Sequence, residues 1–314
     1  DDICLFSADE AVYKEITKIL ESHFKTTDMG AVELYLGIQI LRNADSITLH
    51  QTSYVQRILE KFGMMESRPV PVPSVGLLSA QPIDADCRDS ADVPYRQAVG
   101  SLWYAANCTR PDITFATNAV AQFAQSHGAE HWVAVKRVFR YLAGTMERGI
   151  TYSKSAGIVV TAYCDSDWGN DPETRRSKTG YVIMVAGGAI AWQTKAQKSV
   201  ALSSCEAELY ALCEATKEIM WVSSFLTELG IQFEVPVLHC DNKGAIALAH
   251  NPVGHQRSKH ISIRYYFVRE AIANGILQVE YITTTTNLAD IFTKSTVAVT
   301  FTKHAVVIVS VVEE

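Results

Sequence analysis

The sequence predicts an α/β protein in which a mixed sheet flanked by helices follows a mainly helical segment. Residues 149–294 alternate short runs of β-branched and aromatic residues with helical patterns. Strands that are followed by strand–helix pairs are typical of a mixed sheet with helices packed on it. Residues 95–148 show helical periodicity throughout, and a run of prolines in residues 67–94 marks a boundary before them.

Length and composition describe a globular protein without a strong charge signal. A chain of 314 residues is long enough for about two or three domains. Hydrophobic residues make up 48% and charged residues 20%, which excludes a disordered chain. Because the net charge is −6, any binding of nucleic acid must depend on local basic patches.

The cysteines and the lack of targeting segments bear on the compartment. Seven cysteines without a Cys-x-x-Cys pair argue against a disulfide framework and a zinc knuckle, and favour a reducing compartment. No signal peptide or apolar run of membrane-spanning length is found, so we expect a soluble, intracellular protein without a membrane partner. The chain begins without a methionine, and we expect it to be part of a longer protein.

The first 66 residues predict a small unit of strands and helices. A short strand is expected at Ile3 to Phe6, and a helix at Ser7 to Phe24 with Ser7 as its N-cap. Two strands separated by a turn, and then a second amphipathic helix, are predicted at Val32 to Leu41, Ser46 to His50 and Tyr54 to Phe62.

An irregular linker and three helices are predicted next. The proline-rich residues 67–94 form the linker. The first helix runs from Tyr95 to about Cys108, and the second begins at Pro111, since proline is favoured at the first helical position. The third covers His131 to Leu142.

Residues 149–294 predict the mixed sheet. The expected strands are Ile150 to Tyr152, Ile158 to Asp165, Gly180 to Ala186, Ala189 to Trp192, Val235 to Cys240 and Ile276 to Ile282. A tight turn at Gly187-Gly188 joins the third strand to the fourth. The expected helices are Ser203 to Leu229 with a break near Met220, Asn242 to Ala249, His260 to Ala273 and Asn287 to Lys294.

Two carboxylates lie at the end of the predicted central strand. Strand alternation places Asp165 and Asp167 on one face, where burial is costly unless a metal or a partner meets them. Taken alone, this pair is explained as well by the cap of a turn.

Three further acids favour a metal or partner site over the cap of a turn. Glu208 begins the stripe of its helix that faces the sheet, whereas Glu206 is explained by the helix dipole. Asp241 directly follows a strand, where an N-cap is an equally good interpretation. Asp290 lies in the first turn of a short helix. Together, Asp165, Glu208, Asp241 and Asp290 are expected to meet at one edge of the sheet.

Such a cluster would need cations, because neighbouring carboxylates repel one another. Oxygen ligands without a nearby Cys/His set favour magnesium or manganese. Two ions roughly 4 Å apart suit the attack of water on a phosphodiester.

Five motifs, in the same order along the chain, show a specific resemblance to a known protein family. Tyr163 to Trp168 together with Arg175 to Val182 resembles the first strands of the ribonuclease H domain of copia-type retrotransposon polyproteins. The match continues in order through Val200 to Leu212, Cys240 to Ile246, Asn251 to Ile261 and Ala289 to Lys294. The resemblance implies a ribonuclease H-like fold for residues 149–294, which would hydrolyse RNA in RNA–DNA hybrids. It also implies that Asp165, Glu208, Asp241 and Asp290 hold two magnesium or manganese ions.

The resemblance extends upstream to a reverse transcriptase. Leu34 to Ile38, Gln51 to Val55 and Tyr95 to Leu102 resemble thumb and connection segments, and Asp1 and Asp2 resemble polymerase carboxylates. It implies a palm and thumb remnant at residues 1–66 and a connection at residues 95–148. The implied partners are the hybrid and the rest of the polyprotein. The parent element would be cytoplasmic, in a virus-like particle, or nuclear, and we do not expect polymerase activity from this chain.

Basic residues flank the predicted centre. Phosphate contacts are expected from Arg175, Arg176, Lys178, Lys195 and Lys198, and from a second set made of His255, Arg257, Lys259 and His260. A hybrid-cleaving site must also sense the 2′-hydroxyl of the RNA strand.

The tail departs from the family pattern and leaves two alternatives open. Residues 295–314 include a valine-rich run, Ala305 to Val312, which is expected to be a frameshifted or decayed end that pairs with a strand edge or aggregates. Some ribonucleases H keep a histidine for product release shortly before the last acid, and here Thr283 to Thr286 stand at that place instead. The chain could therefore be a decayed remnant, or an accessory module that binds hybrids for a polymerase.

Overall fold

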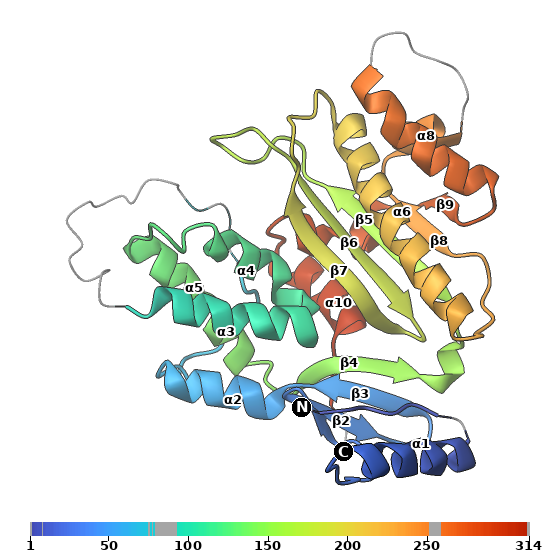
Figure 1. The fold of residues 1–314 in the computed structure, drawn as a ribbon. Coiled ribbons are helices and arrows are strands. Elements are labelled where there is room, and N and C mark those ends of the chain that lie inside the picture. Colours follow the sequence, from blue (N-terminus) through green and yellow to red (C-terminus); the bar gives the residue numbers. More distant parts are fainter. Residues whose placement is uncertain are drawn as a thin grey trace.

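The computed structural model describes residues 2–7, 9–74, 76, 78, 93–250 and 259–312, with only the backbone described at residues 259–262. Two five-stranded sheets and a layer of helices make up this part of the chain (Figure 1). No helix within the described residues is both long and apolar enough to cross a lipid bilayer.

The first sheet joins three distant parts of the chain. Its order is β1-β2-β3-β4-β10, and every neighbouring pair is antiparallel. Its strands are β1 (Leu34–Tyr35), β2 (Ile38–Arg42), β3 (Ser46–His50), β4 (Arg148–Ser153) and β10 (Ser310–Val311). The strand expected at Ile150 to Tyr152 thus belongs to this sheet and not to the second one.

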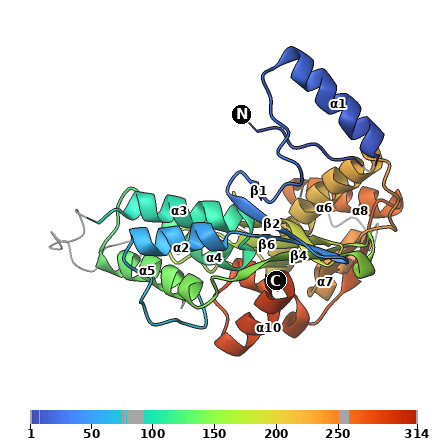
Figure 2. The same ribbon diagram turned by 90° about the horizontal axis from the view of Figure 1, so that it is seen from below.

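The N-terminal segment differs from its prediction in three ways. Helix α1 (Glu10–His23) is capped by Asp9, whose side chain accepts a hydrogen bond from the backbone of Ala11, and not by Ser7. Residues 3–6 form no strand. The single strand expected at residues 32–41 is divided into β1 and β2, because Leu36 and Gly37 turn the chain at positive φ. Helix α1 buries no residue and projects from the molecule (Figure 2).

Four helices form a layer beside the two sheets. They are α2 (Thr52–Lys61), α3 (Tyr95–Cys108), α4 (Thr114–Ala121) and α5 (Ala129–Ala143). Pro111 begins a 3₁₀ turn (Pro111–Ile113) that leads into α4. Leu59, Leu102 and Phe139 are fully buried where these helices meet. The helices predicted in this segment are confirmed, and α3 has the bounds that the sequence indicated.

A buried ion pair connects the 3₁₀ turn with α5. The guanidinium of Arg110 donates to both carboxylate oxygens of Asp112, at 3.0 and 2.7 Å, and both side chains are fully buried. The hydroxyl of Tyr141 donates to the same carboxylate at 2.6 Å, and the backbone carbonyl of Thr145 accepts from the guanidinium at 2.8 Å. Such pairs are stable only when these extra hydrogen bonds are present.

The second sheet is mixed, as predicted. Its order is β7-β6-β5-β8-β9; the β5–β8 and β8–β9 pairs are parallel and the others antiparallel. Its strands are β5 (Val160–Ser166), β6 (Lys178–Val185), β7 (Gly188–Ala196), β8 (Val237–Cys240) and β9 (Gln278–Tyr281).

Helices cover both faces of the second sheet. One face packs against α6 (Ser204–Glu228), with α7 (Lys243–His250) and α8 (Lys259–Ala273) beside it. The other face packs against α4 and α9 (Asp290–Thr293), and α10 (Ala298–Ile308) contacts α9 and shares the same hydrophobic core. Figure 1 shows α6 and α10 on opposite sides of the strands.

Two local predictions in this half are wrong. The hairpin between β6 and β7 turns at Ala186 and Gly187, which both have positive φ, and Gly188 is already in the strand. A Cβ on Gly188 would lie 2.6 Å from the ring of Tyr152, so the glycine is needed for packing. Helix α6 continues through Met220, because it contains no glycine or proline that would interrupt it.

The C-terminal tail is folded. Helix α10 buries Phe301, Ala305 and Ile308 in the hydrophobic core that it shares with the helical layer α2 to α5, and β10 adds Ser310 and Val311 to the edge of β4. The expected pairing with a strand edge is found at Ser310 and Val311, whereas the first part of the valine-rich run, Ala305 to Ile308, is helical.

Replacing Arg110 with Met should strongly destabilise the fold. The change leaves Asp112 buried without a counter-charge, which typically costs about 3–5 kcal/mol in the free energy of unfolding. Urea denaturation measures it, with Lys14→Met as the control, since Lys14 pairs with Glu10 at the surface and contributes little. A loss below about 1 kcal/mol would show that Tyr141 and solvent compensate Asp112.

Candidate active site

Asp165 lies at the centre of the second sheet, near the carboxyl end of β5. Its side chain is 3% exposed, and the hydroxyl of Thr293 donates a hydrogen bond to it. Burial raises the pKa of Asp165, while the nearby Lys294 ammonium opposes that shift. A carboxylate in such a place favours a bound cation.

Asp241 and Asp290 reach the same edge of the sheet. Because β5 and β8 are parallel, Asp241, which directly follows β8, lies beside the end of β5. Its carboxylate accepts a hydrogen bond from Thr284 at 2.6 Å. Asp290 is the first residue of α9, and burial, followed by the charge of Asp165, raises its pKa to about 6.

A glycine in β6 allows α9 to reach this edge of the sheet. Gly180 pairs with Asp165 across β5 and β6, and a Cβ there would lie 2.7 Å from Phe292 and from Thr293. The side-chain amide of Asn287 donates to the carbonyl of Cys164 at 2.9 Å and fixes the segment that precedes α9. As a result, one oxygen each of Asp165, Asp241 and Asp290 lie within 4.8 Å of one another.

Glu208 lies beside this group and is turned toward the strands. It comes from α6, is 5% exposed, and accepts a hydrogen bond from the backbone N–H of Ser166 at 3.1 Å. Its second oxygen lies 3.8 Å from the thiol of Cys240 and forms a separate group with Cys164 and Cys240. Burial and then the charge of Asp165 raise the pKa of Glu208 well above its usual value.

The neighbouring acids Asp167 and Glu206 have structural partners. Asp167 accepts a hydrogen bond from the backbone N–H of Lys178, and burial raises its pKa to about 6. Glu206 accepts from the backbone N–H of Leu202 at 2.7 Å, as expected of an acid in the first turn of a helix. Neither belongs to a metal-sized group within the described residues.

One base lies among the aspartates. The ammonium of Lys294 is 2.9 Å from Asp290 Oδ1 and 3.6 Å from Asp165 Oδ2. The sequence analysis quoted this residue only as part of a motif. Its position four residues after Asp290, one helical turn away, was the available signal.

The acids fit a hard divalent cation. The donors of the aspartate group are all carboxylate oxygens, which Mg²⁺ and Mn²⁺ prefer. Asp290 Oδ1 is buried, and its partner in the structure is the ammonium of Lys294 at 2.9 Å. These observations match a site whose ligands need a cation, with Glu208 available at its side.

The predicted basic residues differ in their exposure. Arg175, Arg176 and Lys198 are exposed, and Lys195 is exposed and lies 3.8 Å from Glu214. Lys178 is buried with its ammonium over the ring of Phe115, so the expectation that it contacts phosphate is not supported.

Several predicted residues lie outside the described part of the chain. These are Asp1, His255 and Arg257, together with the side chains of Lys259 and His260 at the start of α8. Asp2 is exposed.

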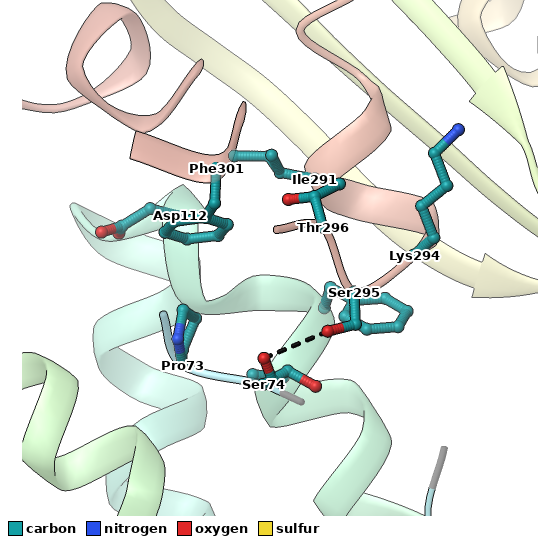
Figure 3. A pocket seen from close by; sticks show the side chains of 10 residues that line it. Pro73, Ser74, Asp112, Ile291, Lys294, Ser295, Thr296 and Phe301 are labelled. Atoms are coloured by element: carbon teal, nitrogen blue, oxygen red, sulfur yellow. Dashed lines mark hydrogen bonds between the residues drawn. The ribbon is translucent and has the colours of Figure 1, made fainter. Parts of the chain in front are cut away.

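A small pocket lies beside the acids, on the far side of Lys294. Its volume of about 10 Å³ is room for about one water molecule. Figure 3 shows the aliphatic part of Lys294 along its wall and the ammonium pointing away, with Ser295 donating to the carbonyl of Ser74 at 3.1 Å.

The chain matches a family model and long curated relatives. A model described as reverse transcriptase (RNA-dependent DNA polymerase) matches residues 1–76. The chain is 40% identical over 301 residues to the retrovirus-related Pol polyprotein from transposon TNT 1-94 of Nicotiana tabacum, which covers 94% of this chain and 23% of that protein. It is 36% identical over 305 residues to the polyprotein from transposon RE2 of Arabidopsis thaliana, which covers 96% of this chain and 21% of that protein.

Among solved structures, the chain is similar to a ribonuclease H1 isolated from compost by a metagenomic approach. The TM-score is 0.35 and the identity 14%, and the match covers 43% of this chain and 92% of that one.

The chain spans less than a quarter of the length of the polyproteins that it matches. Nearly all of the chain aligns with both of them. The chain therefore belongs to the family of copia-type retrotransposon Pol polyproteins and corresponds to one part of such a protein.

Proposed function

We propose that this part of the polyprotein hydrolyses the RNA strand of RNA–DNA hybrids, with Asp165, Glu208, Asp241 and Asp290 as its catalytic carboxylates. The observation that supports the proposal best is the meeting of three aspartate oxygens within 4.8 Å from β5, the end of β8 and α9. These acids are far apart in the sequence, and Asp165 and Asp290 are buried while Asp241 is half-buried, which is a costly arrangement for a fold without a cation-dependent role.

Each acid has a neighbour that orients it. Thr293 donates to Asp165, Thr284 to Asp241, and the backbone of Ser166 to Glu208. When bound, divalent cations would supply an activated water and charge stabilisation for the leaving oxygen. Asp165 is central because it lies next to the other acids, as the charge effects of Asp165 on Asp290 and Glu208 indicate.

The exposed bases near β6 and β7 suit the backbone of a nucleic acid. Arg175, Arg176, Lys195 and Lys198 belong to the loops and strand ends on the amino side of β6 and the carboxyl side of β7. Affinity that depends on such phosphate contacts falls as salt rises. An accessory or decayed module would keep this binding without cleavage.

Substitution of the acids should separate catalysis from folding. Asp165→Asn and Glu208→Gln are expected to lower cleavage of a labelled RNA–DNA hybrid in Mg²⁺ by at least about a hundredfold, because each removes a charged ligand. Glu206→Gln is the matched control: it lies two residues from Glu208, on the same helix, and Gln can replace Glu in its capping role.

The cleavage assay decides among the functions. Full activity of the Asp165→Asn protein, or equal losses in Glu206→Gln and Glu208→Gln, would contradict the proposed roles. Hybrid binding without any cleavage by the wild type would support an accessory module instead.

The pH dependence of stability should report on Asp290. Its pKa is raised in the folded state from near 3.8 to about 6, so the folded state favours the protonated acid. Without a divalent cation, this group therefore lowers the stability as pH rises from about 4 to 6, and the loss remains above pH 6. Thermal unfolding in chelator should show a smaller decline for Asp290→Asn over this window. Identical slopes for the two proteins would exclude Asp290 as the cause.

The close packing on Gly180 should be required for the metal site. Gly180→Ala places a Cβ against Phe292 and Thr293 and should push α9 away from β5, which weakens Mg²⁺ binding and cleavage together. Gly157→Ala is a control on an exposed turn, where no heavy atom lies within 4 Å, although its positive φ carries some strain of its own. Calorimetric Mg²⁺ titration measures the effect, and unchanged affinity in Gly180→Ala would show that α9 adapts.

A further inference from the structure

Lys294 holds a position that a metal ion would also need. Its ammonium lies 2.9 Å from Asp290 Oδ1 and 3.6 Å from Asp165 Oδ2, and both carboxylates are buried. Among the described residues, Lys294 is the one base at ion-pair distance from these two acids. The three aspartates, by contrast, carry like charges within 4.8 Å of one another.

We propose that Lys294 is a built-in counter-ion of the carboxylate cluster, and that a divalent cation must displace its ammonium in order to bind. The proposal rests on the function proposed above, because it concerns the same acids. It assigns to Lys294 the control of metal affinity and of the stability of the metal-free protein.

Competition follows from the shared oxygens. One ammonium contacts two of the three aspartates, so it reduces their mutual repulsion in the metal-free state. A divalent ion needs the same oxygens and carries a like charge, so the two cations cannot both stay within contact distance without repelling each other. Metal binding is therefore weaker than it would be in a cluster without the lysine.

The side chain can leave without moving the fold. The backbone N–H of Lys294 donates to the carbonyl of Asp290 at 3.2 Å and ends α9, so the backbone is fixed. The aliphatic part lies along the small pocket beside Ser295 and Thr296, and the ammonium projects beyond it (Figure 3). About a third of the side chain is exposed, which gives the flexible four-carbon chain access to solvent.

The test compares Lys294→Met with Lys303→Met. Lys303 is an exposed lysine on α10, and its ammonium donates to the carbonyl of Thr285 at 3.4 Å. Its replacement therefore controls for the loss of one positive charge. In chelator, Lys294→Met should unfold at a lower temperature than either the wild type or the control. In a calorimetric Mg²⁺ titration, Lys294→Met should bind about tenfold more tightly, because a competing charge is gone.

A second measurement follows the wild-type protein and uses a variant only to assign the signal. In the wild type, the ¹⁵N-labelled ammonium signal of Lys294 should be visible in chelator, where the ion pair slows proton exchange, and should shift or vanish as Mg²⁺ is added. Assignment comes from Lys294→Arg, which keeps the charge and removes the signal. A signal that Mg²⁺ leaves unchanged would overturn the displacement.

The outcomes also separate this inference from the proposed function. If the wild type binds Mg²⁺ and cleaves hybrids while Lys294→Met has the same affinity and the same stability in chelator, the inference is wrong and the function stands. If no protein binds Mg²⁺ but Lys294→Met is less stable in chelator, the counter-ion role stands and the metal-dependent function is wrong.

Discussion

The repulsion among buried carboxylates is the constraint on which the second half of the molecule depends. Asp165, Asp241 and Asp290 are brought within 4.8 Å, and burial raises the pKa of Asp165 and Asp290. Such an arrangement lowers stability unless a positive charge lies between the acids. In the structure that charge is the ammonium of Lys294. The proposed metal binding would therefore be coupled to folding, because the metal and Lys294 would act on the same carboxylates.

The fold creates this cluster through backbone features as much as through the acids. Parallel pairing of β5 with β8 places the residues that follow each strand at one edge. Gly180 leaves space for α9, and Asn287 attaches the chain before it to the carbonyl of Cys164. Glu208 arrives from the second turn of α6, whose continuous helix packs along β5 and β6. Its orientation toward Ser166 and Cys240 keeps it next to the aspartates without joining their group.

The sequence predicted the elements that have a strong local signal. The bounds of α3 and β3 follow from hydrophobic periodicity and turn residues, and both are confirmed. Some wrong predictions are local, such as the cap of α1 and the break in α6, and others concern partners that lie far away along the chain. Nothing in the sequence near Ile150 indicates that β4 pairs with β3 and β10. These two partner strands lie far away along the chain, at residues 46–50 and 310–311. Likewise, the burial of Lys178 over Phe115 depends on α4, which a local basic pattern does not reveal.

The two sheets are not independent units, and this changes how the acidic edge is supported. One face of the second sheet, with Val182 and Met184, shares its hydrophobic core with α2, α3 and α5, and Trp192 donates to the carbonyl of Ala106 at 2.9 Å. The tail adds to this connection, since α10 packs in the same core and β10 closes the first sheet on β4. Because α9 lies between the sheet and α10, the tail holds Asp290 and Lys294 against Asp165. The position of the acidic cluster thus depends on the helical layer and on the C-terminal tail as well as on the strands that carry its acids.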